Sequence, residues 1–187
     1  MPKHRRSSKS TPQYTLLSIT IENYEARCTA GINLDLLGPA QYIENEDEFT
    51  YRFDTTLEIS GVCIDPEERS GEQYDITIYT ADPESWQLQS RIRDLREQDE
   101  QGITKCKKLK SGEYPIYREP PSIGFLDKVR GENRYTMAIW LGPLMITDTL
   151  ILLSRKKQTY ISIHEKKFDR KRRIKTFTIQ TLDPANE

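Results

Sequence analysis

Histidine and cysteine, the side chains that most often carry metal or nucleophilic chemistry, are scarce in this chain. The two histidines, His4 and His164, are too few for a histidine-rich zinc site. The three cysteines, Cys28, Cys63 and Cys106, lie far apart and lack the short spacing of a zinc or redox motif. We therefore expect no metal site and no cofactor, and we expect reduced thiols rather than a disulfide framework.

Motifs for acyl transfer, metal-dependent hydrolysis or phosphate binding are missing as well. The sequence contains no GxSxG, HExxH, GxxxxGK[ST] or GxGxxG pattern. The acidic run 44–48 offers oxygen ligands but lacks the glycine-containing pattern of a calcium loop, so a solvated turn is the preferred interpretation. Asp148 interrupts an apolar run, where a regular strand would require a bulge or an arginine partner. The sequence predicts no catalytic residue and no enzyme.

Basic residues are concentrated in segments that could bind nucleic acid. Residues 1–10 carry a net charge of +4, residues 11–154 carry −11 and residues 155–175 carry +8. Lysine and arginine bind phosphates, and neighbouring aromatic rings can stack on bases. The candidate nucleic-acid-binding residues are Lys166, Lys167, Arg170, Lys171, Arg172, Arg173, Lys107 and Lys108. A solvated surface that discourages edge-to-edge pairing of strands is the simpler interpretation of the same charges.

A protein partner is the other class of ligand that the sequence indicates. Residues 111–133 form a long irregular stretch rich in proline and glycine, and such connections are usually functional. Its aromatic residues Tyr114, Tyr117 and Phe125 are the candidate partner-binding residues. A partner could also engage a surface helix or add a strand to a sheet edge, and self-association through an edge is a further alternative.

Alternating polar and apolar residues predict that β-strands position these groups. The clearest alternation runs from Tyr51 to Cys63, which indicates a strand with one wet face. Further strands are expected at 17–22, 26–36, 74–79, 103–110, 114–117, 134–141, 144–153, 159–164 and 174–182. One surface helix is expected near 83–101, because Asp82 and Pro83 form a start signal and Gly102 follows its end.

These elements predict a mainly β fold with a single helix. We expect an antiparallel β-sandwich, jelly-roll-like or a flattened barrel, over residues 14–183 as one domain, preceded by a basic flexible arm at 1–13. No apolar run reaches the length of a membrane span, so we expect a cytoplasmic protein without a membrane partner. The leading functional hypothesis is a non-enzymatic protein that binds another protein or assembles with itself. The alternative is sequence-nonspecific nucleic-acid binding by the basic C-terminal loop and the arm.

Overall fold

Seven strands close into a β-barrel in the computed structural model, which describes residues 11–32, 51–81, 91–155, 157–168 and 171–184. Around the barrel the strands follow the order β1, β2, β3, β7, β6, β9 and β8, and β8 returns to β1. Their bounds are β1 Gln13–Ile32, β2 Tyr51–Asp65, β3 Gln73–Thr80, β6 Gly124–Lys128, β7 Arg134–Leu141, β8 Tyr160–Phe168 and β9 Lys171–Gln180. The mainly β prediction is confirmed.

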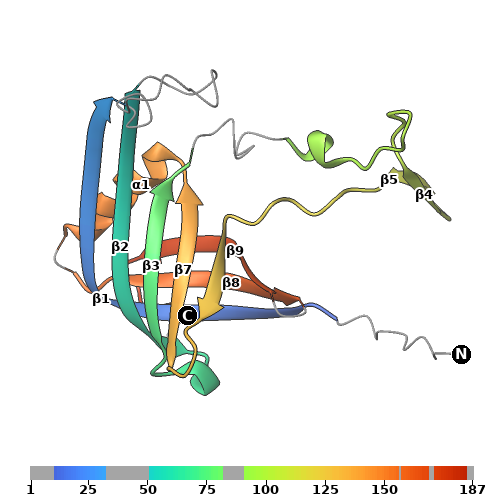
Figure 1. Ribbon diagram of the computed structural model, residues 1–187. Coiled ribbons are helices and arrows are strands. Elements are labelled where there is room, and N and C mark those ends of the chain that lie inside the picture. Colours follow the sequence, from blue (N-terminus) through green and yellow to red (C-terminus); the bar gives the residue numbers. More distant parts are fainter. Residues whose placement is uncertain (1–10, 33–50, 82–90, 156, 169–170, 185–187) are drawn as a thin grey trace, which may run out of the picture. The chain divides into compact units, whose positions relative to one another are not determined.

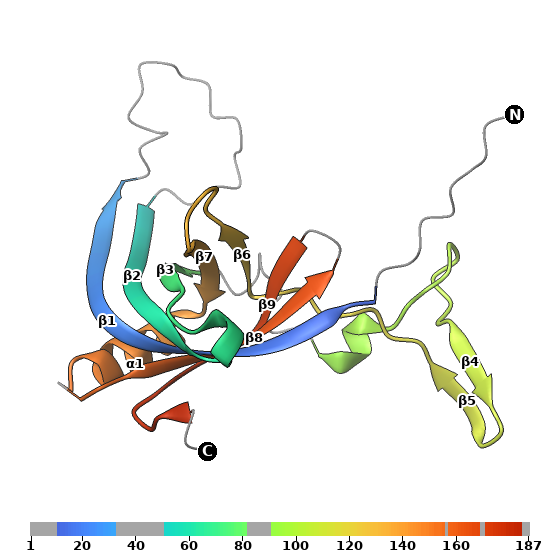
Figure 2. The ribbon, with the colours of Figure 1, turned by 90° about the horizontal axis from the view of Figure 1, so that it is seen from below.

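The barrel closes because β1 is long and bends. Its first part pairs antiparallel with β8 and its second part with β2, as Figures 1 and 2 show. Two register shifts, at Ser18/Ile19 and Ile21/Asn23, mark the bend, and bulges of this kind increase the local twist of a strand. A Cβ on Gly61 would overlap the carbonyl oxygen of Thr20, so only glycine permits the close approach of the two strands at this point. Of the two forms expected from the sequence, the structure therefore has the barrel rather than the sandwich.

One strand pair departs from the predicted antiparallel arrangement. Strands β3 and β7 run parallel, and every other neighbouring pair of the barrel runs antiparallel. A parallel pair needs a long crossover connection, and here residues 81–133 separate the two strands and include β6. Periodicity identifies a strand but carries no information about the direction of its neighbour, which is why the sequence did not indicate this pair.

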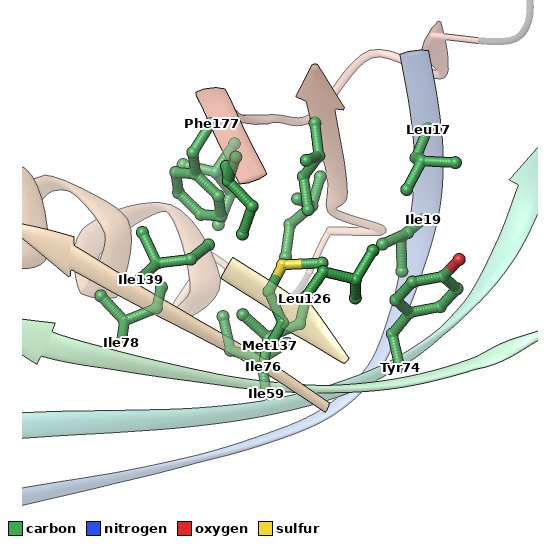
Figure 3. Packing of buried hydrophobic residues seen from close by; sticks show 14 of the residues in the cluster. Leu17, Ile19, Ile59, Tyr74, Ile76, Ile78, Leu126, Met137, Ile139 and Phe177 are labelled. Atoms are coloured by element: carbon green, nitrogen blue, oxygen red, sulfur yellow. The ribbon is translucent and has the colours of Figure 1, made fainter. Parts of the chain in front are cut away.

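The barrel interior is filled by apolar side chains from all seven strands. Figure 3 shows Leu17 and Ile19 of β1 meeting Met137 and Ile139 of β7 in the same interior. Buried residues alternate along the strands, as in Leu57, Ile59 and Cys63 or in Tyr74, Ile76 and Ile78. This confirms the inward face predicted for the second half of 51–63.

The segment predicted as a strand at 144–153 is instead a helix, α1 (Pro143–Leu153). Gly142 is its N-cap and Pro143 occupies the first helical position, where the missing N–H costs nothing. Ile146, Thr149 and Leu153 are buried, at a spacing that puts them on one side of the helix. Asp148 is exposed, so the bulge or arginine partner expected for it is not needed. An apolar run without clear periodicity fits a strand and a helix equally well.

Residues 81–122 form a second compact unit, separate from the barrel unit of residues 1–80 and 123–187. Strands β4 (Cys106–Leu109) and β5 (Gly112–Pro115) make a hairpin, and isolated bridges join Arg96 to Tyr117 and Gln98 to Thr104. The prediction of a helix near 83–101 is wrong for residues 91–101, which are the part of that range that the structure describes. Residues 92–95 form a short 3-10 helix, and the following residues turn back along the hairpin; residues 83–90 lie outside the described part of the chain.

Most other strand predictions are confirmed with shifted ends. The strands expected at 17–22 and 26–36 are one continuous strand up to residue 32, and residues 33–36 lie outside the described ranges. Strand β6 was missed, since only five residues form it within the stretch interpreted as irregular. Residues 1–10 of the predicted arm 1–13 lie outside the described residues. Gln13, its last residue, already belongs to β1. The extent predicted for the domain, 14–183, stays a prediction.

Candidate nucleic-acid interface

Aromatic and basic side chains lie in one row across the outer surface of the barrel. Tyr14 of β1 pairs with Lys166 of β8, which pairs with Arg173 of β9, which in turn pairs with Phe125 of β6. Lys166, Arg173 and Phe125 each have a chain neighbour buried in the interior, namely Glu165, Ile174 and Leu126. Since side chains alternate between the two faces of a strand, the paired residues point outward. We call Tyr14, Lys166, Arg173 and Phe125, together with Trp140 of β7 and Tyr79 of β3, the aromatic–basic row.

Ring contacts continue the row at both ends. The Lys166 ammonium lies 5.8 Å from the centre of the Tyr14 ring. On the other side of Arg173, the Phe125 and Trp140 rings are 5.5 Å apart and tilted, and the Trp140 and Tyr79 rings are stacked at 5.6 Å. Neighbouring strands are about 4.8 Å apart, so Tyr14 and Phe125, three strands apart, are separated by about 14 Å across the surface. The cations of Lys166 and Arg173 therefore lie between the Tyr14 ring on one side and the rings of Phe125, Trp140 and Tyr79 on the other.

The rings of the row are accessible. Tyr14 is 56% exposed, Tyr79 39% and Phe125 38%. The two paired positions that follow Phe125 across the sheet, Ala138 and Thr77, carry no charge, and the first acid in this register is Glu58 on β2. A surface of this composition offers cations to phosphate groups and ring faces to bases.

The basic residues predicted at the C-terminal end separate into outward and inward ones. Lys171 and Arg173 are exposed, and Lys166 is half-buried beside Tyr14. Arg172 points the other way, and its Nη1 donates to Oε1 of the buried Glu165 at 2.7 Å. Lys167, opposite Arg172 in the ladder, is half-buried, and Arg170 lies outside the described residues.

Arg172 belongs to a charged network that fills one end of the barrel. Arg69, in the short 3-10 helix Glu67–Arg69, donates to Glu72 at 2.6 Å and to Glu165 at 2.7 Å, and it also contacts the Tyr74 hydroxyl. The Tyr74 hydroxyl in turn donates to Glu72 at 2.8 Å. Two arginines thus meet two glutamates, and no buried side-chain polar atom among the described residues lacks a hydrogen-bond partner. The network holds the ends of β3, β8 and β9 in place behind the outward-facing cations.

The pKa values at this end of the barrel reflect burial and mutual pairing. Burial raises the pKa of the Tyr74 hydroxyl above its usual value, and it raises that of the Cys63 thiol to about 11. Burial acts to raise the pKa of Glu72 too, but hydrogen bonds from Arg69 and Tyr74 outweigh it and lower that pKa. The Arg69 pKa is raised by its partners against the effect of burial. The shifts of Tyr74, Glu72 and Arg69 keep the network in the charge state that its contacts require.

The remaining sequence-predicted residues lie in two places. Lys107, Lys108, Tyr114 and Tyr117 belong to the unit of residues 81–122, where all four are exposed. Phe125 belongs to the barrel unit and to the aromatic–basic row. Tyr114 and Tyr117 thus belong to one unit and Phe125 to the other, and their role in binding a partner stays a prediction.

The unit of residues 81–122 has a charged hollow of its own. The hollow measures about 570 Å³. Its lining residues are Arg93, Asp94, Arg96, Glu97, Gln98, Lys105 and Arg118. Basic side chains outnumber acidic ones in this lining, so an anion is the kind of ligand that would fit it.

Sequence reasoning did not select three members of the aromatic–basic row, Tyr14, Trp140 and Tyr79. Tyr14 was placed next to the basic arm, and Tyr79 was assigned to the wet face of its strand without a role. The sequence carried only a weak signal, because single exposed rings are common and only a contiguous exposed patch marks a binding surface. The pairing of strands far apart in sequence, which brings these rings together, could not be inferred from it.

Other candidate sites from the sequence find little support in the described residues. Within the described ranges, no group of three or more histidine, cysteine, aspartate or glutamate residues could hold a metal ion. Cys28 and Cys106 are exposed free thiols, and Cys63 is a buried one. The acidic run 44–48 lies outside the described ranges.

Two broader findings complete the description of the site. No helix in the described part of the chain combines the length and the apolar character needed to cross a membrane. Comparison with protein-family models, curated proteins and solved structures finds no match to this chain.

Proposed function

We propose that this chain is a non-enzymatic binding protein whose ligand is single-stranded nucleic acid, held without sequence preference on the aromatic–basic row. One observation carries the proposal: four outward residues, two rings and two cations, occupy paired positions on adjacent strands. Proteins that bind single strands combine a basic surface that follows the backbone with rings on which bases stack. The barrel interior is packed with apolar side chains, so the ligand binds outside it.

The row supports this ligand better than it supports a duplex. A duplex presents its phosphates but hides the faces of its bases, whereas an unpaired strand exposes both. Lys166 and Arg173 would bind phosphates, and the rings of Tyr14 and Phe125 would accept bases on either side. The charge of Arg172 is taken up by Glu165, so Arg172 positions the strand end and does not belong to the binding surface.

The test is binding of a fluorescein-labelled oligothymidine, followed by fluorescence anisotropy at about 50 and about 200 mM salt. Single-strand binding weakens with salt by a slope of about 0.7 per phosphate contact, so the double variant K166E/R173E is expected to lower the slope by about 1.4. Its affinity at low salt is expected to fall at least about tenfold. Tyr14→Ala is expected to lower affinity by about 5- to 100-fold without changing the slope, because stacking is not ionic.

The matched control is R155E/K157E, which changes the charge by the same amount. Both control residues are exposed and precede β8, whereas Lys166 lies near the end of that strand. The start of β8, which the control residues precede, lies about 20 Å from Lys166 along the strand direction. The proposal would be contradicted if the unmodified protein did not bind the oligothymidine, or if both double variants lost affinity for it equally.

A protein partner remains the second candidate function, and α1 is the observation that favours it. Leu144, Met145 and Ile151 of this helix are 82%, 37% and 48% exposed. Large apolar side chains exposed close together on one helix mark a surface that a partner can cover. The test applies if oligonucleotides do not bind. A protein that the unmodified chain captures, and that the folded variant L144K/I151K does not capture, would support this candidate.

A further inference from the structure

The second part of β1 is an open strand edge. Pairing with β8 ends at Thr20. Beyond it, the N–H of Ile21 donates to the carbonyl oxygen of Thr159 at 3.1 Å, and the Gln158 side chain donates to the carbonyl oxygen of Ile21 at 3.1 Å. From there to Ile32 the strand pairs with β2 on one side only, and no described strand lies on its other side. With respect to the described residues, the outer backbone groups along residues 22–32 are therefore open to a further strand.

This edge lacks two of the features that usually prevent pairing with another chain. Residues 22–31 are all exposed, and they contain neither lysine nor proline. Natural proteins protect long edges with lysine, proline, a bulge or a covering element. The protective features described here are the register shift between Ile21 and Asn23 at the base of the edge and the charged side chains Glu22, Glu25 and Arg27. Such charges discourage pairing with most strands, but a partner strand with complementary charges can still pair with this edge.

The charges on the edge are complementary to those of a second copy. In an antiparallel pair centred on Ala26, Glu25 of each chain lies opposite Arg27 of the other. Centring the pair on Glu25 or on Arg27 would instead place like charges opposite each other. Opposite charges at directly paired positions stabilise a sheet and like charges destabilise it. The edge therefore matches itself in one register.

We propose that two copies of this chain pair antiparallel through residues 22–31 of β1, about a twofold axis at Ala26. The contact joins β2 and β1 of one copy to β1 and β2 of the other in one continuous sheet. Tyr24 of each copy lies opposite Cys28 of its partner, on the side of the strand away from Glu25 and Arg27. This surface is separate from the aromatic–basic row.

The first test is the oligomeric state of the full chain by sedimentation equilibrium over a wide concentration range. A concentration-dependent particle of twice the chain's mass is expected. Glu25→Arg replaces both attractive pairs by repulsive ones and is expected to weaken the dimer about tenfold or more. The charge-swapped variant E25R/R27E restores opposite charges and is expected to recover the dimer.

The matched control is Glu22→Arg, which makes the same change of charge at a position that faces the uncharged Ala30 of the partner in this register. Its dimer is expected to be as strong as that of the unmodified protein. Circular dichroism shows whether each variant keeps its β-sheet content.

The second test fixes the register by cross-linking. In a C28S/C106S background, which removes both exposed thiols, Ala26→Cys places two thiols at the twofold axis. A disulfide-linked dimer is then expected under mild oxidation. Asn23→Cys in the same background is expected to give none, because its own copy lies about 20 Å away along the strand. A chain that stays monomeric, or a dimer that ignores Glu25→Arg and does not cross-link at residue 26, overturns the proposal.

Discussion

Arg172 and Arg173 are neighbours in sequence with opposite surroundings in the fold. Arg173 is exposed in the aromatic–basic row, and Arg172 is bonded to Glu165, whose side chain is only 2% exposed. In the sequence both belong to one basic run. Because side chains alternate along a strand, Arg172 points inward and Arg173 points outward. The two residues therefore have separable effects on stability and on binding.

At the residue scale we predict that Arg172→Met destabilises the fold and Arg173→Met does not. Removing Arg172 leaves Glu165 with Arg69 as its remaining ion-pair partner, which should cost about 1–3 kcal/mol of unfolding free energy. Arg173→Met should change it by less than about 0.5 kcal/mol. Urea unfolding of both variants, with the unmodified protein alongside, measures the difference. Equal stability of the two variants would show that the ion pair with Glu165 contributes nothing.

At the element scale, α1 is the part of the fold that differs most from the sequence-based expectation. The same apolar run that fits a strand forms a helix whose main barrel contacts are with β3 and β9. Its buried side chains extend the apolar interior, since Ile146 and Leu153 belong to the core cluster. The helix is therefore a structural part of the barrel.

We predict that Ile146→Ala costs about 2–5 kcal/mol of unfolding free energy, because it opens a cavity beneath α1. Leu144→Ala is the control on the same helix. Leu144 is 82% exposed, so its truncation should change stability by less than about 0.5 kcal/mol. Both substitutions introduce the best helix former, so helix propensity does not account for a difference. Chemical denaturation followed by circular dichroism gives both values, and similar losses would mean that α1 does not pack as described.

At the scale of the whole molecule, the barrel unit contains the entire apolar cluster. Every residue of that cluster belongs to residues 1–80 or 123–187, and none of the described residues from 91 to 122 with an apolar side chain is buried. The two junctions of the inserted unit are close together. Tyr79 pairs with Trp140, whose N–H bonds to the carbonyl oxygen of Ile123 at 2.9 Å.

We predict that replacing residues 82–121 by about six glycine and serine residues leaves a folded barrel. The linker must cross two strand spacings, about 10 Å, which such a chain spans readily. The shortened protein should keep a cooperative unfolding transition within about 1 kcal/mol of the original, since loop length contributes weakly to stability. Calorimetry and circular dichroism test this, and loss of the cooperative transition would show that the barrel depends on the inserted unit.

Local patterns identified most of the strands and, where alternation was clear, their buried faces. The two-residue alternation in 51–63 and 74–79 predicted strands whose alternate residues enter the core, because side chains of a strand point to opposite sides whatever its neighbours are. The alternation also marked Tyr79 as solvent-facing. Capping signals at Gly142 and Pro143 were present, but the apolar run after them has no period that separates helix from strand.

Only the tertiary structure decided which strands are neighbours, and the candidate site depends on that choice. Lys166 and Arg173 come from the consecutive strands β8 and β9, whereas Tyr14 and Phe125 come from strands far from these in the chain. One row forms only because β1 pairs with β8 and β6 pairs with β9. Pairing between distant strands depends on barrel closure and register, which no local pattern encodes. The amino-acid sequence by itself determined the kinds of side chains available for binding, whereas closure of the barrel placed cations and rings together on its outer surface.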